Sequence, residues 1–173
     1  MPMPASEQRI GKFMIAMAFI AILGLLSLFF DQVLEQRRNP NTQPTTAYHT
    51  DGYKEVVLIR NRSHHYLTTG QINGEDVLFL LDTGATVVSI PENVANRLNL
   101  KRGSPMLAQT ANGTITTYQT QIDQVSIGDI RLHGVRASIN PYMEGEEVLL
   151  GMSFLKQLTL IQEGNRLVLR QHQ

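Results

Sequence analysis

An unbroken apolar run that ends on a carboxylate constrains this chain more than any other feature. The run Val77-Leu78-Phe79-Leu80-Leu81 is followed at once by Asp82, Thr83 and Gly84. Consecutive apolar residues bounded by a glycine turn predict a buried β-strand. An acid at the end of such a strand is costly to bury unless it is paired or hydrogen-bonded. Asp82 is therefore the first candidate for a functional carboxylate.

Composition excludes several classes of protein. The 173 residues include 15 basic and 15 acidic side chains, so the chain has no net positive charge to attract nucleic acid. Cys is absent, which excludes disulfides, thiol catalysis and Cys-ligated metals. His64 and His65 are adjacent and would point to opposite faces of a strand, so we do not expect them to share a metal. We expect no cofactor, no metal and no nucleic-acid partner.

The segment from Phe13 to Phe30 contains no charged residue. As an α-helix this segment would be about 27 Å long, which is close to the ~30 Å hydrocarbon core of a bilayer. We predict a retained transmembrane helix at 13–30, preceded by an N-terminal tail at 1–12. A cleaved signal peptide is one alternative, although residues 28–32 offer no small-residue cleavage site. A buried core helix is the other.

Residues 31–50 are predicted to form a flexible linker, because Asn39 to Ala47 is polar, contains two prolines and lacks apolar periodicity. Such a linker would be exposed and open to autoprocessing. The folded domain would then occupy residues 51–173.

The charges that flank the apolar segment do not decide its orientation in a membrane. Arg9 and Lys12 on one side balance Arg37 and Arg38 on the other. A short tail before the segment and a large domain after it have the layout of a signal anchor. We therefore expect the tail in the cytoplasm and the domain outside it.

The remainder of the chain predicts short strands separated by turns. Asn73-Gly74 and Asn112-Gly113 are strong signals for tight hairpins. A helix is expected from an N-cap at Ser89 to Leu98, and a second helical segment after Gly151. The expected strands are 54–59, 66–72, 77–81, 121–127, 130–139, 148–151, 158–161 and 166–169. This pattern predicts an all-β fold, a small barrel or sandwich with one or two short helices.

Peptide hydrolysis without a metal needs both a general base and a general acid. Two neighbouring carboxyls that share one proton fill both roles, because like charges so close together cannot both ionise. The sequence Asp-Thr-Gly occurs once in this chain. For this chemistry a second carboxylate must come from another copy, with Asp82 facing its counterpart across a two-fold axis. A monomer should then be inactive.

The region from Tyr66 to Leu169 resembles the retropepsin-like aspartic proteases, in particular the bacterial, membrane-anchored type. Four features match in order: the strand ending in Asp82-Thr83-Gly84-Ala85, the turn and helix through Ile90 to Leu98, the hairpin around Asn112-Gly113, and the run Val148 to Leu155. This resemblance implies a closed retropepsin-like barrel and a homodimeric aspartic endopeptidase that cleaves proteins or peptides. It also implies a single-pass protein of a bacterial inner membrane with its domain in the periplasm.

The resemblance also implies roles for individual residues. Asp82 would be the catalytic aspartate, in an active-site loop formed with Thr83, Gly84 and Ala85. Ala111, Asn112 and Gly113 would form the tip of a flap that closes over the substrate; a plain surface hairpin is the alternative. A non-catalytic, membrane-anchored peptide-binding or sensing module on the same fold is the alternative function.

Overall fold

The computed structural model describes residues 5–110 and 113–172, and it divides into two compact units that meet between Arg37 and Arg38. The first unit is a single helix and the second is a β-domain. Ala111 and Asn112, which were predicted to lie at the flap tip, fall outside the described residues.

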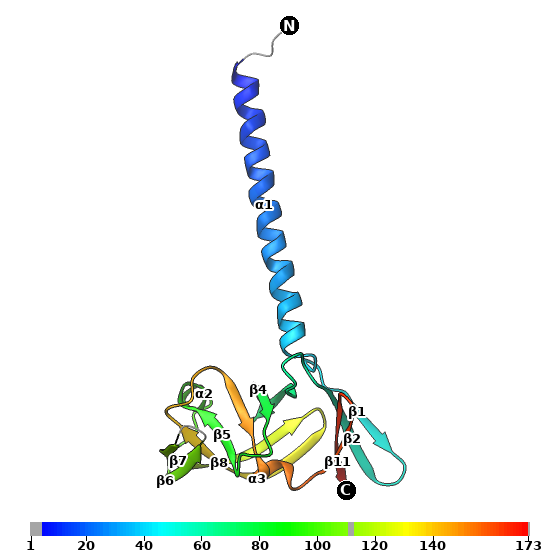
Figure 1. The fold of residues 1–173 in the computed structure, drawn as a ribbon, viewed down its shortest axis with the longest axis vertical. Helices are drawn as coiled ribbons and strands as arrows, with labels where there is room; N and C mark the ends of the chain where they lie inside the picture. The colour runs from blue at the N-terminus through cyan, green and yellow to red at the C-terminus, as the bar shows by residue number, and fades with distance from the viewer. Residues whose placement is uncertain (1–4, 111–112, 173) are drawn as a thin grey trace. The chain divides into compact units, whose positions relative to one another are not determined.

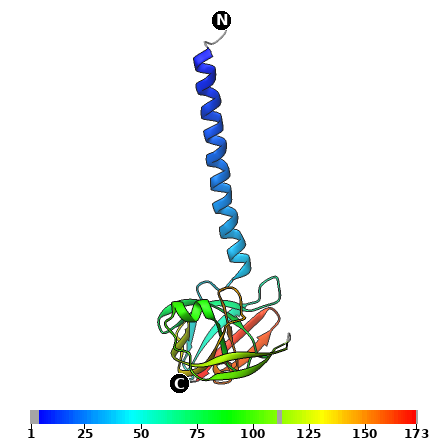
Figure 2. The same cartoon turned by 90° about the vertical axis from the view of Figure 1, so that its left-hand side faces the viewer.

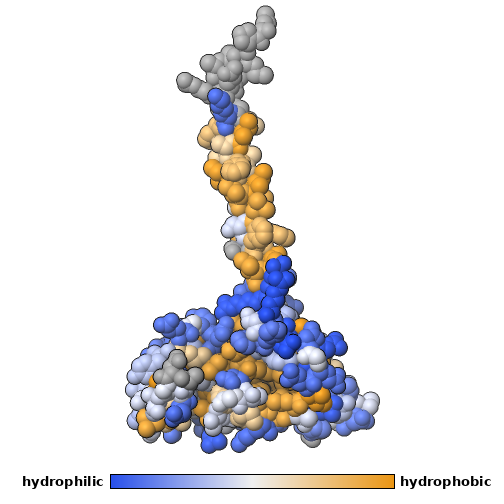
Figure 3. Space-filling view, in the orientation of Figure 1, coloured by the Kyte–Doolittle hydropathy of each residue, from blue (hydrophilic) through white to orange (hydrophobic). Residues whose placement is uncertain are grey.

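The first unit consists of helix α1 (Ala5–Arg38). Its part from Lys12 to Arg38, 27 residues, is long and apolar enough to cross a membrane. Figure 3 shows apolar side chains along most of this part of the helix. By length and composition α1 is a candidate membrane span, as predicted. The helix does not stop at Phe30 but continues to Arg38, so its end lies beyond the predicted boundary.

The second unit consists of two β-sheets and two short helices, α2 (Glu92–Arg97) and α3 (Met152–Leu155) (Figure 1). The four-stranded sheet has the order β1-β2-β11-β10: β1 (Thr46–His49), β2 (Tyr53–Ile59), β11 (Arg166–His172) and β10 (Thr159–Glu163). The seven-stranded sheet has the order β3-β4-β9-β5-β8-β7-β6: β3 (Leu67–Ile72), β4 (Glu75–Leu81), β9 (Glu147–Leu150), β5 (Val88–Pro91), β8 (Ile130–Asn140), β7 (Gly113–Ile127) and β6 (Pro105–Thr110).

The larger sheet closes on itself. Strand β3 pairs with β4 and also with β7, through Gln71 opposite Ser126 and Ile72 opposite Val125. The pairings therefore form a ring β3-β4-β9-β5-β8-β7, from which β6 extends as an additional edge strand. Figure 2 shows the long yellow-green strand β7 crossing much of the width of this unit. The predicted all-β fold with a closed barrel and short helices is confirmed.

Alternating apolar residues fill the interior of the ring, as expected for strands with one buried face. The largest side chains that are fully buried include Phe79, Ile90, Ile122, Phe154 and Leu169. The four-stranded sheet adds its inner face to the same core through Val56 and Leu58 of β2. The core therefore continues from the barrel to the second sheet.

The predicted linker at 31–50 is wrong in the structure. Asn39 and Asn41 are buried, and β1 pairs in register with β2. The Asn41 side chain donates to the carbonyl oxygens of Leu67 (2.6 Å) and Ile59 (2.9 Å) and accepts from the Ile59 N–H (2.7 Å). An asparagine can satisfy backbone groups in this way, so a polar segment rich in turn residues is fixed between β2 and β3. We call residues 38–41 the strap.

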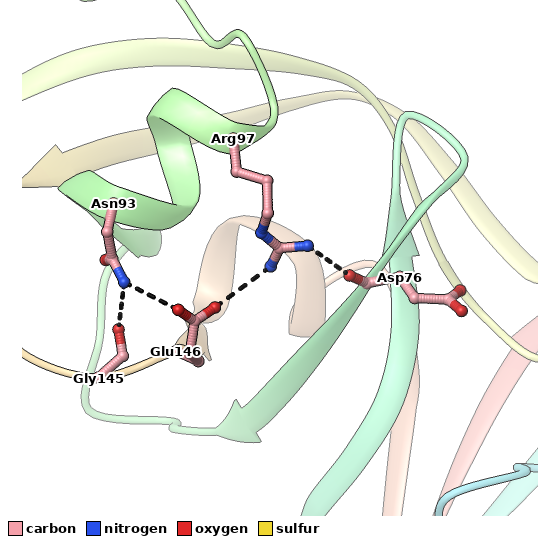
Figure 4. A network of polar contacts seen from close by, with 5 residues as sticks. All are labelled: Asp76, Asn93, Arg97, Gly145 and Glu146. Carbon is pink, nitrogen blue, oxygen red and sulfur yellow. Dashed lines mark hydrogen bonds and ion pairs between the residues drawn. The ribbon is translucent and has the colours of Figure 1, made fainter.

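The helix predicted after Ser89 begins later than expected. Ser89 is not an N-cap but lies in β5, whose Ile90 pairs with Ile139 of β8, and α2 begins at Glu92 without a side-chain cap. Figure 4 shows how α2 is fixed: Asn93 and Arg97 both contact Glu146 of the loop before β9, and Arg97 also donates to the Asp76 carbonyl. These exposed contacts connect α2 to the loop before β9 and to the β3–β4 hairpin.

Candidate active site

Asp82 is the first residue after β4, at the point where the barrel strand ends. Its N–H donates to the Leu150 carbonyl of β9 (3.2 Å), which continues the parallel pairing of Leu81 with Leu150. The Asp82 side chain is half-buried, and its Oδ1 accepts from the Gly84 N–H (2.8 Å). This hydrogen bond fixes the direction of the carboxylate, while Oδ2 makes no hydrogen bond within the part of the chain that the structure describes.

The segment after β9 supports the loop that begins at Asp82. We call residues 82–87 the Asp82 loop. Met152 and Ser153 at the start of α3 donate their N–H groups to the carbonyl oxygens of Ala85 (2.8 Å) and Thr86 (3.1 Å). A Cβ atom at Gly151 would meet the carbonyl oxygen of Val87 and would lie 2.6 Å from that of Ala85. The loop therefore packs directly on the backbone at Gly151, which explains why a glycine follows β9.

Ser153 is a positioning residue, and the sequence analysis assigned it no role of its own. Its hydroxyl accepts from the Val88 N–H (3.0 Å) and donates to the Arg136 carbonyl (2.7 Å). It is buried, and it joins α3 to β5 and β8 at the base of the loop. A serine after an apolar-apolar-Gly-Met run is a weak signal by itself, because only the fold reveals which backbone groups lack a partner there.

Asp82 lines a cavity of about 550 Å³. Its lining combines the Asp82 loop, the ends of β5, β8 and β9, and both strands of the β6–β7 hairpin: Asp82, Gly84, Ala85, Thr86, Val87, Ser89, Met106, Leu107, Ala108, Gln109, Thr110, Ile115, Thr117, Ser138, Asn140 and Leu149. Asp82 is the one charged side chain among these described residues. The cavity thus places a single carboxylate in an otherwise neutral site large enough for several side chains of a peptide.

The predicted site residues come together in part. Asp82, Gly84 and Ala85 line the cavity, whereas Thr83 is exposed and does not. Gly113 begins β7 with a positive φ of 117°, and its carbonyl accepts from the Thr110 hydroxyl (2.8 Å). The hairpin that carries it lines the same cavity as Asp82, although the two tip residues lie outside the described part of the chain.

The residues present limit the chemistry of the site. Among the described residues, no group of three His, Asp or Glu side chains is arranged to hold a metal ion. One carboxylate can act as a base or as an acid, but hydrolysis of an amide needs both at once. The described lining offers no second acid, so one copy supplies a single carboxylate to this cavity.

Comparisons with known proteins agree with this geometry. Residues 68–157, just over half of the chain, match the family described as "gag-polyprotein putative aspartyl protease". An uncharacterized Sinorhizobium protein encoded in the cobV 5′ region is 30% identical over 116 residues, which cover 65% of this chain and 50% of that protein. The chain thus spans only about half the length of this curated relative.

Two solved structures are similar to this chain. A retropepsin-like aspartic protease from Rickettsia conorii superposes with a TM-score of 0.56 at 20% identity, covering 75% of this chain and 95% of that one. The protease of EIAV, in complex with an inhibitor, gives a TM-score of 0.46 at 22% identity over 56% of this chain and 89% of its own. With the family match spanning the strand that ends in Asp82, the cavity and the supporting α3, the chain belongs to the gag-polyprotein aspartyl protease family and has the retropepsin-like fold.

Proposed function

We propose that this chain is an aspartic endopeptidase in which Asp82 residues from two copies form one catalytic pair. The observation that carries this proposal is the single, half-buried carboxylate of Asp82, oriented by the Gly84 N–H at the base of a neutral cavity. The family membership supports peptidase activity.

The mechanism follows from two carboxyls that share a proton. The ionised Asp82 of one copy takes a proton from a water molecule, whose oxygen attacks the carbonyl carbon of the scissile peptide. The protonated Asp82 of the other copy donates to the carbonyl oxygen, which gives a tetrahedral diol. The diol then loses one hydroxyl proton to a carboxylate, the C–N bond breaks, and the amine leaves with a proton from the other carboxyl. The pH profile belongs to the pair as a unit and not to either residue.

The other predicted roles remain part of the proposal. Thr83 is exposed beside Asp82, where its hydroxyl is available to the loop of a second copy. The β6–β7 hairpin, including Ala111, Asn112 and Gly113, acts as a flap that closes over substrate and excludes water, because its two strands line the cavity. The 51–173 region, extended at its N-terminus by the strap and β1, is the protease domain.

Helix α1 anchors the protease as a single-pass protein of a bacterial inner membrane, with the domain in the periplasm. Confinement of two copies to one bilayer raises their effective concentration and favours the dimer. This orientation is tested by fusing two reporters in turn to the C-terminus, one active only in the periplasm and one active only in the cytoplasm. Activity of the cytoplasmic reporter alone would refute the orientation.

The activity is tested with the full-length protein in detergent and an unfolded protein substrate. Wild type should cleave at mildly acidic pH, and Asp82→Asn should not, although both melt at the same temperature. Wild type and Asp82→Asn are then mixed in equal amounts, dissociated and allowed to reassociate. The activity per total protein should be about a quarter of that of wild type alone, because only pairs of two wild-type copies are active. A fall to about half would indicate that one copy suffices. A dimer that binds peptides at every pH without cleavage would instead establish the non-catalytic binding module.

A further inference from the structure

A second hollow lies next to the Asp82 cavity. It has a volume of about 810 Å³ and is open to solvent along one side. Most of its lining residues are polar or charged, and we call it the basic groove: Asn73, Leu98, Asn99, Leu100, Lys101, Arg102, Gly103, Ser104, Gln119, Thr120, Gln121, Asp123 and Arg136. None of these residues lines the Asp82 cavity.

The basic groove continues the Asp82 cavity along the same two strands. In the antiparallel pair β7–β8, Gln119 lies opposite Ser138 and Gln121 lies opposite Arg136. Ser138 lines the cavity, whereas Gln119 lines the groove, so the two hollows meet at this residue pair. Alternate residues of a strand share a face, which places Thr117, Gln119 and Gln121 of β7 in one row.

One stretch of chain also borders both hollows. Residues 98–104 line the basic groove, and residues 106–110 line the cavity. The Gly103 N–H donates to the Gln119 carbonyl (2.7 Å), and the Gln119 N–H donates to the Ser104 carbonyl (3.0 Å), so this stretch is held to β7 at the junction. The cavity and the groove therefore border the same strand, β7, and the same stretch of chain, and we call the two hollows together the trough.

The charges of the two halves of this trough differ. Apart from Asp82 the cavity is neutral, whereas the basic groove contains Lys101, Arg102, Arg136 and one acid, Asp123. Arg102 is neutralised by an ion pair with Glu92 and stacks 4.7 Å over the Tyr118 ring. Lys101 and Arg136 make no ion pair within the described residues, so their charges are available to a ligand.

We propose that the basic groove is an extended substrate subsite that selects an acidic side chain at a distance from the scissile bond. This inference rests on the proposed protease function and adds a substrate class to it. A peptide seated over Asp82 runs along the trough in an extended conformation, and each residue advances by about 3.3 Å. The step along the strands from Thr117 to Gln121, roughly 13 Å, corresponds to about four residues of substrate. Lys101 and Arg136 would then meet Asp or Glu at that position.

The test uses full-length protein and fluorogenic peptides that differ only by a Glu or Gln, scanned over six positions on each side of the cleaved bond. Glu near the fourth position on one side should raise kcat/KM by roughly three- to tenfold at low salt, mainly through KM, since partly exposed ion pairs are individually weak. This preference should disappear in the double variant Lys101→Gln/Arg136→Gln and in high salt, and it should increase in Asp123→Asn.

The controls separate failure of the subsite from failure of the proposed protease. Arg131→Gln removes an exposed charge of β8 outside the groove and should keep the preference. Cleavage of neutral and acidic peptides at equal rates at every position would overturn the subsite and leave the protease intact. If no peptide is cleaved, anisotropy of labelled peptides on Asp82→Asn decides: tighter binding of an acidic peptide that the double variant loses supports the subsite, and equal binding overturns it.

Discussion

The strap gives a quantitative prediction, because the side chain of Asn41 forms hydrogen bonds with three backbone groups inside the domain. Asn41→Ala removes its hydrogen bonds to the Leu67 carbonyl (2.6 Å), the Ile59 carbonyl (2.9 Å) and the Ile59 N–H (2.7 Å). The site is only 6% exposed, so water does not readily replace the lost partners. At about 1 kcal/mol for each bond, the free energy of unfolding should fall by about 3 kcal/mol.

This loss converts to a change in melting temperature through the entropy of unfolding. For a unit of roughly 135 residues the entropy is about 0.29 kcal/mol/K, so the midpoint should fall by about 10 °C. The measurement is tyrosine fluorescence of the full-length protein in detergent during heating. All five tyrosines lie in the β-domain and the chain has no Trp, so the signal reports on this domain alone.

A matched control lies two residues away. Gln43 belongs to the same polar segment, Asn39 to Ala47, but its side chain is exposed. Gln43→Ala should therefore change the melting midpoint by less than 2 °C. If Asn41→Ala melted as close to wild type as this control, residues 38–41 would be a flexible linker after all, and the strap would be refuted.

The other predictions concern the loop support and one titrating contact. Gly151→Ala should abolish cleavage and destabilise the domain by about 3 kcal/mol or more, since its Cβ collides with backbone oxygens of the Asp82 loop; urea unfolding and a peptide assay measure both. Ser153→Ala should cost about 2 kcal/mol by urea unfolding, because the Val88 N–H and the Arg136 carbonyl lose a buried partner. The hydrogen bond to Asp129, aided by desolvation, raises the pKa of Tyr48 above its ordinary 10.0. The neutral phenol is thus favoured in the folded state, and the stability that Tyr48→Phe removes should be constant at neutral pH and vanish as the pH rises above 10; urea midpoints at pH 8 and pH 11 check this.

The strand that ends in Asp82 could be predicted from sequence because its signal is local. Five apolar residues must be buried, and the acid and glycine after them end the strand. The structure gives β4 as Glu75–Leu81, which contains the predicted 77–81. The hairpin at Asn73-Gly74 followed in the same way, since Asn73 and Gly74 both adopt the positive φ that such turns need.

Features that depend on distant partners could not be predicted. Ser89 resembles an N-cap in sequence, but the chain from Val88 to Pro91 gains more from pairing with β8 than from an extra helical turn. Asn39 and Asn41 resemble linker residues, because nothing in the sequence shows that Ile59 and Leu67 lack backbone partners at that place. The positioning role of Ser153 could not be predicted for the same reason, since its hydrogen-bond partners are 65 and 17 residues away in the sequence.

The strap also changes where the folded domain begins. A fragment starting at residue 51, as the sequence suggested, would lose Asn39, Asn41 and the whole of β1. It would lose the Thr46 hydroxyl that accepts from the Asp129 N–H (2.8 Å) at the β7–β8 turn as well. It would also lose Arg38, which contacts Glu147 (2.7 Å) at the start of the strand that ends beside Asp82. Proteolysis within residues 39–47 would therefore break the domain itself. We expect the smallest stable fragment to begin at Arg38, and we do not expect autoprocessing within residues 39–47 of the folded protein.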